Sequence, residues 1–194
     1  VMQSASTRQL VVWIGPECLL LSAGLNVALA VRVAQQRTAI EQDAGEDRLQ
    51  IGLRVNPFDA RDSRGRTVRI DVQAEGRPTV LYTFQWGCAW CERNHEALLA
   101  LHSQLSERYR FIGISLDDEH LEDMLEDYPL PFEVVSAVDR NFIEAYRLGG
   151  TPRTLVLDSQ GKVEASYYGA YIGSTRSSIS ARFDVELPVV REDG

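Results

Sequence analysis

The chain has 194 residues, of which 44% are hydrophobic and 25% are charged, which is typical of a globular protein with one domain and some additional chain. Its formal net charge of −8 and the lack of a basic run argue against nucleic-acid binding. Three cysteines are too few for a disulfide-stapled mini-protein, and the cysteines and histidines lack the spacing of a zinc site. We therefore expect neither a metal nor a cofactor.

An apolar run from Leu10 to Val31 precedes the rest of the chain. As a helix it would be about 33 Å long, enough to cross a bilayer core of about 30 Å. The rival interpretation is a signal peptide cleaved after Ala28-Leu29-Ala30, but the run exceeds the roughly 7–15 apolar residues usual in such peptides. We predict an uncleaved, single-pass transmembrane anchor over residues 1–33.

The charges around this run leave its orientation open, because Arg8 precedes it and Arg32 and Arg37 follow it. Glu17 lies within the run and has two interpretations: it reaches the lipid headgroups, or it pairs with a helix of another membrane subunit. Its neighbour Cys18 is expected to pack as a small apolar residue.

Residues 34–54 are mostly polar and are predicted to form a stalk that carries a soluble domain at 55–184. Residues 185–194 are expected to be a C-terminal tail, loose from Pro188 onward. Within the domain, strands are predicted at Arg66–Asp71, Pro78–Phe84, Arg110–Leu116, Pro131–Ala137, Arg153–Asp158 and Val163–Gly169. Helices are predicted at Ala89–Tyr109, within Asp117–Tyr128, from Asp139 to Tyr146 and at Ser174–Phe183.

The helix bounds rest on end signals as well as on periodicity. Asp139 is predicted to cap its helix, with Gly149-Gly150 closing it. The acids that open Asp117–Tyr128 suit a helix N-terminus. Strands that alternate with helices indicate an α/β fold, in which a parallel or mixed sheet is covered on both faces.

The working site of such a sheet lies at the carboxyl ends of its strands. Cys88 and Cys91, in the stretch Cys-Ala-Trp-Cys, directly follow the strand Pro78–Phe84, and Cys88 stands where the next helix begins. A thiol at a helix N-terminus is favoured as the thiolate, so we predict Cys88 as the nucleophile and the more buried Cys91 as the resolving thiol. A purely structural disulfide is less favoured, because so short a loop restrains little of the unfolded chain.

Aromatic and basic residues surround the pair. Trp86 and Trp90 are predicted to form an apolar collar for a partner's backbone, although Trp90 could instead pack against the sheet. His95 lies on the same helix face as the cysteines, either as a cation that lowers a thiol pKa or as a solvated side chain.

A Cys-x-x-Cys after a buried strand, followed by Gly150-Thr151-Pro152 entering a β-hairpin, resembles the thioredoxin fold. The segments RFIGISLDD and DRNFIEAYRLGGTPRTLVLDSQGKV resemble more closely the membrane-anchored thiol–disulfide oxidoreductases of the TlpA and ResA kind and the redoxin domains related to peroxiredoxins. This resemblance covers about Ile51 to Gly169. It implies a cis Pro152 opposite the cysteines and backbone hydrogen bonds from Thr151 to an extended client.

The chain also departs from that pattern. Gly87 stands where the family usually has a tryptophan, and Tyr82 stands where thioredoxin has a buried aspartate. A peroxiredoxin would carry a Thr-x-x-Cys motif, which is missing, so we favour thiol–disulfide exchange over peroxide reduction.

Two hypotheses follow. In the first, the chain is a thiol–disulfide oxidoreductase in the bacterial cytoplasmic membrane whose domain faces the periplasm, with protein thiol and disulfide clients such as cytochrome c thiols. In the second, it is a thioredoxin-like accessory subunit of a larger membrane complex, with an idle or structural disulfide. Intact Cys88 and Cys91 favour the first.

Overall fold

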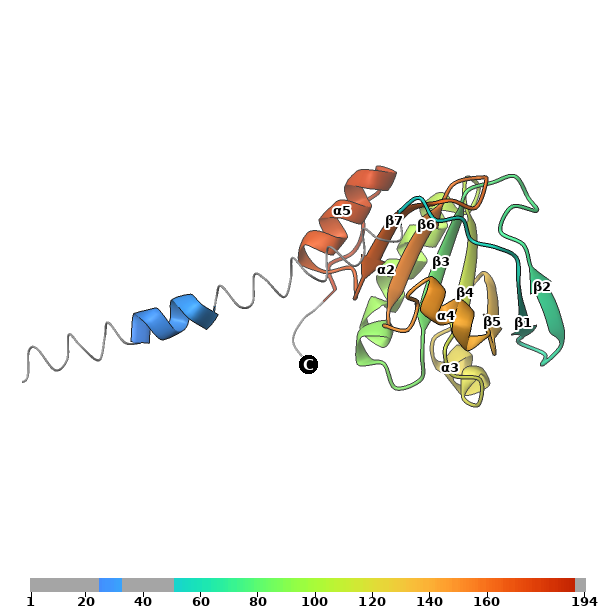
Figure 1. Cartoon of the computed structure of the whole chain (residues 1–194), viewed down its shortest axis with the longest axis horizontal. Helices are drawn as coiled ribbons and strands as arrows, with labels where there is room; N and C mark the ends of the chain where they lie inside the picture. The colour runs from blue at the N-terminus through green and yellow to red at the C-terminus, as the bar shows by residue number, and fades with distance from the viewer. Residues whose placement is uncertain (1–24, 33–50, 191–194) are drawn as a thin grey trace, which may run out of the picture. The chain divides into compact units, whose positions relative to one another are not determined.

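The computed structural model describes residues 25–32 and 51–190 (Figure 1). Contacts divide the chain into two units, Val1–Glu46 and Asp47–Gly194. In the first unit residues 25–32 are helical, whereas Glu17, Cys18 and most of the predicted anchor lie outside the described residues, as do residues 34–50 of the predicted stalk. Within the described ranges, no helix combines the length and the apolar character required to cross a bilayer.

The second unit is built on a mixed seven-stranded sheet in the order β2-β1-β5-β4-β3-β6-β7 (Figure 1). Its strands are β1 (Phe58–Asp62), β2 (Thr67–Ile70), β3 (Thr79–Phe84), β4 (Arg110–Ser115), β5 (Glu133–Ser136), β6 (Arg153–Leu157) and β7 (Val163–Tyr168). Strands β3, β4 and β5 run parallel, and the others join antiparallel. The predicted α/β class with a mixed sheet is therefore confirmed.

Four helices cover both faces of this sheet: α2 (Ala89–Leu105), α3 (Leu121–Asp127), α4 (Arg140–Ala145) and α5 (Gly173–Phe183). On one face, α2 and α5 bury Leu101 and Ile179 in a cluster with Val80 of β3. On the same face, α3 packs beside the start of α2. On the other face, α4 places Phe142 against a cluster that contains Leu81 of β3. Both sides of β3 are thus buried, as its continuous apolar sequence predicts.

Three local predictions from the sequence need correction. Strand β1 is absent from the predicted strands, because only alternate residues of FDARD are buried and three of its five residues are charged. Helix α2 ends at Leu105 instead of Tyr109, since the N–H groups of Arg108 and Tyr109 both bond the Leu105 carbonyl in a turn that leads into β4. The acids that open Asp117–Tyr128 precede α3, where the Asp117 carboxylate accepts N–H bonds in a turn.

The ends of α4 are set by side-chain chemistry and by one unusual backbone conformation. Asp139 caps the helix as predicted and accepts the Asn141 N–H at 2.8 Å. The closing residue is Arg147 rather than the glycine pair, with a left-handed φ of 49°. Leu148 N–H bonds the Ile143 carbonyl and Arg147 N–H bonds that of Glu144, the pattern of a Schellman motif.

Residues before β1 and residues after α5 also pack against the sheet and helices of this domain. Gly52 and Val55 donate N–H bonds to carbonyls of Val163 and Gly161, so residues ahead of β1 already belong to the domain. At the other end Leu187 and Val190 are buried in the same cluster as α2 and α5. The expectation of a loose chain from Pro188 is therefore wrong as far as residue 190.

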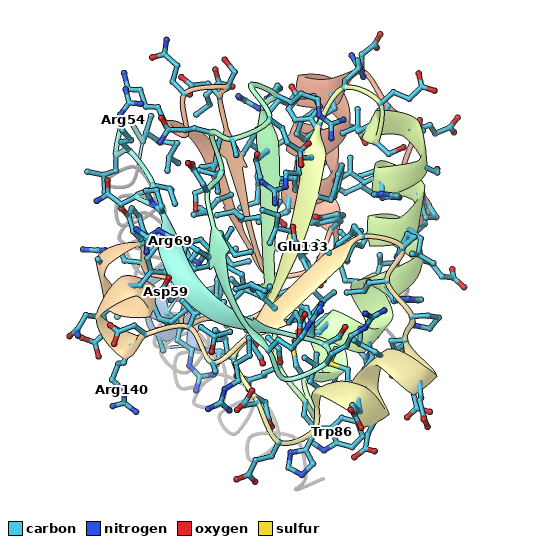
Figure 2. All side chains as sticks on the ribbon, turned by 90° about the vertical axis from the view of Figure 1, so that its right-hand side faces the viewer. Arg54, Asp59, Arg69, Trp86, Glu133 and Arg140 are labelled. Atoms are coloured by element: carbon cyan, nitrogen blue, oxygen red, sulfur yellow. A yellow bond between two sulfur atoms is a disulfide. The ribbon has the colours of Figure 1, made fainter. Side chains whose placement is uncertain are left out.

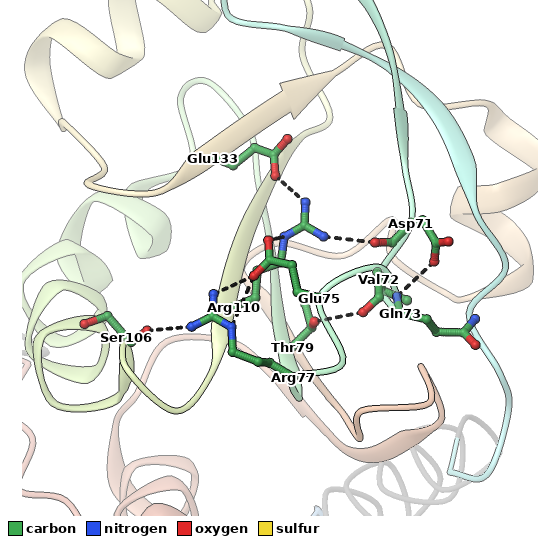
Figure 3. Close-up of polar contacts among 9 residues, drawn as sticks. All are labelled: Asp71, Val72, Gln73, Glu75, Arg77, Thr79, Ser106, Arg110 and Glu133. Atoms are coloured by element: carbon green, nitrogen blue, oxygen red, sulfur yellow. Dashed lines mark hydrogen bonds and ion pairs between the residues drawn. The ribbon is translucent and has the colours of Figure 1, made fainter.

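The amino ends of the parallel strands are held by charged groups (Figure 3). Arg110, the first residue of β4, contacts Glu133 at 2.7 Å and Glu75 at 3.2 Å, and it donates to the Asp71 carbonyl at 2.9 Å. Arg77 also pairs with Glu75, at 2.6 Å. This network fastens the loop before β3 to the starts of β4 and β5.

Candidate functional site

The two cysteines lie at the carboxyl ends of the parallel strands, directly after β3. Cys88 is the N-cap of α2, and Cys91 lies one turn into the helix. They form a disulfide with a Cα–Cα distance of 5.2 Å. The Cys88 Sγ accepts the Cys91 N–H at 3.1 Å, so this sulfur lies at the N–H groups of the first turn of α2. Those groups would also stabilise a thiolate on Cys88 after reduction.

The two sulfurs differ in their surroundings. Cys88 is partly exposed, whereas Cys91 is only 4% exposed. Cys91 belongs to a buried cluster with Tyr82 and Phe84 of β3 and with Leu98 of α2. Cys88 is therefore the more accessible sulfur of the two, and Cys91 is the more buried one.

A groove of about 320 Å³ is formed beside Trp90, the residue that precedes Cys91. The peptide bond between Thr151 and Pro152 is cis, and both residues line this groove together with Trp90 and Tyr168. Trp90 and Tyr168 are 41% and 45% exposed, so Trp90 lines the groove and is not buried against the sheet. The groove thus offers aromatic surface and a cis-proline loop next to the helix that carries the disulfide.

Trp86 has different neighbours from Trp90. Its indole stacks on the His120 imidazole, with ring centroids 5.6 Å apart, and Figure 2 shows it at the end of the domain opposite Arg54. His120 Nδ1 lies 3.1 Å from an Asp117 carboxylate oxygen. Partial burial would raise the pKa of Asp117, but hydrogen bonds from His120 and Glu119 lower it below its ordinary value. Asp117 is therefore an anionic support for the ring that holds Trp86.

His95 contacts the segment that follows α3. Its Nε2 lies 2.9 Å from the Pro129 carbonyl, and its ring meets Tyr128 edge-to-face. It therefore joins α2 to the loop after α3.

Sequence reasoning missed a fully buried amide, Asn94, on the helix that carries the cysteines. Asn94 lies on the same stripe as Cys91, Leu98 and Leu101, and a polar residue on a buried stripe could have drawn attention to it. Its amide donates to the Tyr82 hydroxyl at 3.3 Å. Burial raises the pKa of Tyr82 far above its ordinary value, so this phenol remains neutral and does not replace a carboxylate.

Comparison with known proteins gives relatives of modest identity. A thioredoxin-like protein of Haemophilus influenzae is 27% identical over 124 residues, covering 59% of this chain and 72% of the relative. The thiol–disulfide oxidoreductase ResA of Bacillus cereus is 25% identical over 132 residues, covering 65% of this chain and 74% of the relative. These names agree with the enzyme class predicted from Cys88 and Cys91.

Solved structures share the fold at lower identity. The thioredoxin domain of a thiol–disulfide oxidoreductase from Bacteroides vulgatus has a TM-score of 0.57 at 19% identity and covers 69% of this chain and 96% of that one. A thiol:disulfide interchange protein DsbE from Chlorobium tepidum has the same TM-score at 18% identity, covering 69% of this chain and 93% of that one. The domain therefore has the thioredoxin-like fold that the sequence predicted.

The family assignment rests on a match that extends beyond the cysteine motif. Residues 51–166, more than half of the chain, match the AhpC/TSA family. This range contains β1 to β6, both cysteines and the cis Thr151–Pro152 bond. The chain therefore belongs to the AhpC/TSA family.

Proposed function

We propose that this protein is a membrane-tethered, extracytoplasmic thiol–disulfide oxidoreductase that works through the dithiol of Cys88 and Cys91. One observation carries the proposal: a partly exposed Cys88 caps α2 and is bonded to a buried Cys91 beside the cis-proline groove. The apolar run from Leu10 to Val31 supports the tether, with the domain in the bacterial periplasm.

In the reducing direction, the Cys88 thiolate attacks one sulfur of a client disulfide. A mixed disulfide forms, and the other client sulfur leaves as a thiolate and takes a proton from water. Cys91 loses its proton and attacks the Cys88 sulfur, so the Cys88–Cys91 disulfide forms and the second client thiol is released. Two electrons pass to the client in each cycle, and the reverse sequence oxidises a client dithiol.

The groove residues have roles in binding. Thr151 presents backbone groups to an extended client segment, and the cis Pro152 shapes the loop that carries them. Trp90 and Trp86 supply apolar surface on either side of Cys88. Aromatic side chains bury large areas at little entropic cost, so they suit clients of varied sequence.

The test uses the full chain expressed in a bacterium. Cys91→Ser should accumulate mixed disulfides with exported proteins, because no second thiol remains to resolve them. Cys88→Ser is the matched control and should trap none. If the Cys91→Ser variant traps no client and its Cys88 reacts slowly with iodoacetamide at neutral pH, the oxidoreductase proposal is wrong. The accessory-subunit hypothesis then takes its place. The tether is tested separately, because the chain should remain in the membrane pellet after alkaline carbonate extraction.

A further inference from the structure

Asn94 is a fully buried side chain on the helix that carries both cysteines. Burying an amide is unfavourable unless its hydrogen-bonding groups are satisfied, so an asparagine on the apolar side of α2 requires a structural reason. The proposed disulfide exchange by Cys88 and Cys91 makes no direct use of it.

The bonds of Asn94 lead out of α2. Its Oδ1 accepts the backbone N–H of Tyr171 at 2.8 Å, and its Nδ2 donates to the Tyr82 hydroxyl at 3.3 Å. A backbone N–H can only donate, so this bond sets the orientation of the amide. The Tyr171 hydroxyl in turn lies 2.8 Å from Thr154 Oγ1, two residues after the cis Pro152.

Tyr171 belongs to the loop between β7 and α5, and its neighbours face the groove. Gly169, Ala170 and Ile172 line the groove, whereas the Tyr171 side chain is inserted into the core with 0% exposure. Through Tyr171, this loop is bonded both to α2, which carries Trp90, and to β6, which follows Thr151–Pro152. The three parts that line the groove are thus connected by two buried hydrogen bonds.

We propose that Asn94 is a positioning residue that sets the shape of the client groove by holding the 169–172 loop against α2. The inference rests on the proposed function and deepens it: Asn94 governs how a client segment docks, not the reactivity of the cysteines. A polypeptide client that occupies the groove depends on Asn94, while a small disulfide that reaches Cys88 from solvent does not.

The test compares two substrates with the reduced full chain in detergent: insulin, which must dock a chain segment, and bis(2-hydroxyethyl) disulfide. Asn94→Leu removes both hydrogen bonds of the Asn94 side chain. KM for insulin should rise about tenfold, which corresponds to the loss of the one buried hydrogen bond that holds the loop. The second-order rate with the small disulfide should stay within about twofold. Asn94→Asp retains an acceptor for the Tyr171 N–H and should restore KM for insulin.

Two further variants separate positioning from damage to the core. Tyr82→Phe removes the other partner of Asn94 but leaves the Tyr171 bond, so KM for insulin should not change. Thr154→Val removes the hydrogen bond between Tyr171 and β6, while the Gly169 N–H still bonds the Pro152 carbonyl, so that KM should rise by only about threefold. This variant provides a readout if Asn94→Leu fails to fold. If Asn94→Leu lowers the reaction rate equally with both substrates, or leaves KM for insulin unchanged, the proposal is overturned.

Hydrogen exchange gives a readout that does not require turnover. Amides of residues 169–172 should exchange faster in Asn94→Leu than in the parent protein and should be protected again in Asn94→Asp. If the parent reduces neither substrate, the proposed function fails. The exchange arm then still decides whether Asn94 holds the loop, and unchanged protection would refute that.

Discussion

The two ends of the parallel strands use side chains in opposite ways. At the amino ends, Arg110 is only 15% exposed at its side chain and is satisfied by Glu75, Glu133 and the Asp71 carbonyl (Figure 3). At the carboxyl ends, Trp86 and Trp90 are each 41% exposed beside a disulfide. One end satisfies its polar groups internally, and the other presents aromatic surface to solvent.

This difference separates stability from function. Charged groups that are paired at the amino ends join loops to strands, and their loss would destabilise the fold. Exposed aromatic rings contribute less to folding than buried ones, and in the proposed function the rings near Cys88 contact a client. Substitutions at the carboxyl ends should therefore affect turnover, and substitutions at the amino ends should affect the free energy of unfolding.

The largest expected effect is at the redox end. Cys88→Ser should reduce client turnover to the level without enzyme, because the thiol that remains in the pair, Cys91, is buried and does not reach a client disulfide. Serine is a good N-cap, so helix α2 should persist and the stability loss should be limited to about 2 kcal/mol from opening the short disulfide loop. Insulin reduction and urea unfolding measure the two quantities. Residual turnover in this variant would break the comparison.

At the amino ends, Arg110→Ala should lower the free energy of unfolding by about 2–3 kcal/mol, because Glu75, Glu133 and a carbonyl lose a partly buried cation. Turnover per folded molecule should not change. The matched control is Arg69→Ala, whose ion pair with Asp59 is exposed on both sides and should contribute at most about 0.5 kcal/mol. Urea titrations compare the three proteins, and equal stability of both variants would contradict the assigned role of the network.

A smaller effect is expected from the ring beneath Trp86. His120→Ala removes the stacked imidazole and should raise KM for insulin by roughly threefold, since an aromatic pair contributes about 0.5–1.5 kcal/mol. Stability should be nearly unchanged, because the His120 side chain is 43% exposed. His95→Ala, which removes the histidine bonded to Pro129, is the control and should leave KM as it was. If His95→Ala raises KM and His120→Ala does not, client contact would instead be assigned to the side of α2 that carries His95.

The smallest effect concerns acid stability at the amino ends. The hydrogen bond from Arg77 holds the pKa of Glu75 below its ordinary value of 4.5. A carboxyl with a lowered folded-state pKa stabilises the fold above 4.5, and this contribution is lost as the pH falls through the folded-state value. Unfolding free energies should therefore fall less steeply below pH 4.5 in Glu75→Gln than in the parent. Parallel curves for the two proteins would remove Glu75 from the account.

The local sequence accounts for much of the domain. Continuous apolar residues predict β3, Asp139 predicts the start of α4, and the spacing of Cys88 and Cys91 after a buried strand predicts the position of the disulfide. These signals are local: they depend on hydrophobic period, capping and helix-end electrostatics over a few residues.

Other features depend on contacts between distant segments, so only the tertiary structure decided them. Asn94 meets Tyr171 across 77 residues, and Trp86 meets His120 across two loops that lie side by side because β3 and β4 are parallel neighbours. Arg147 adopts a left-handed conformation that sequence preference assigns to glycine. Sequence alone determined where the Cys-x-x-Cys pair lies, directly after a buried strand and at the start of a helix. The groove beside them required the fold, because its walls come from strands, loops and helices that are adjacent only in space.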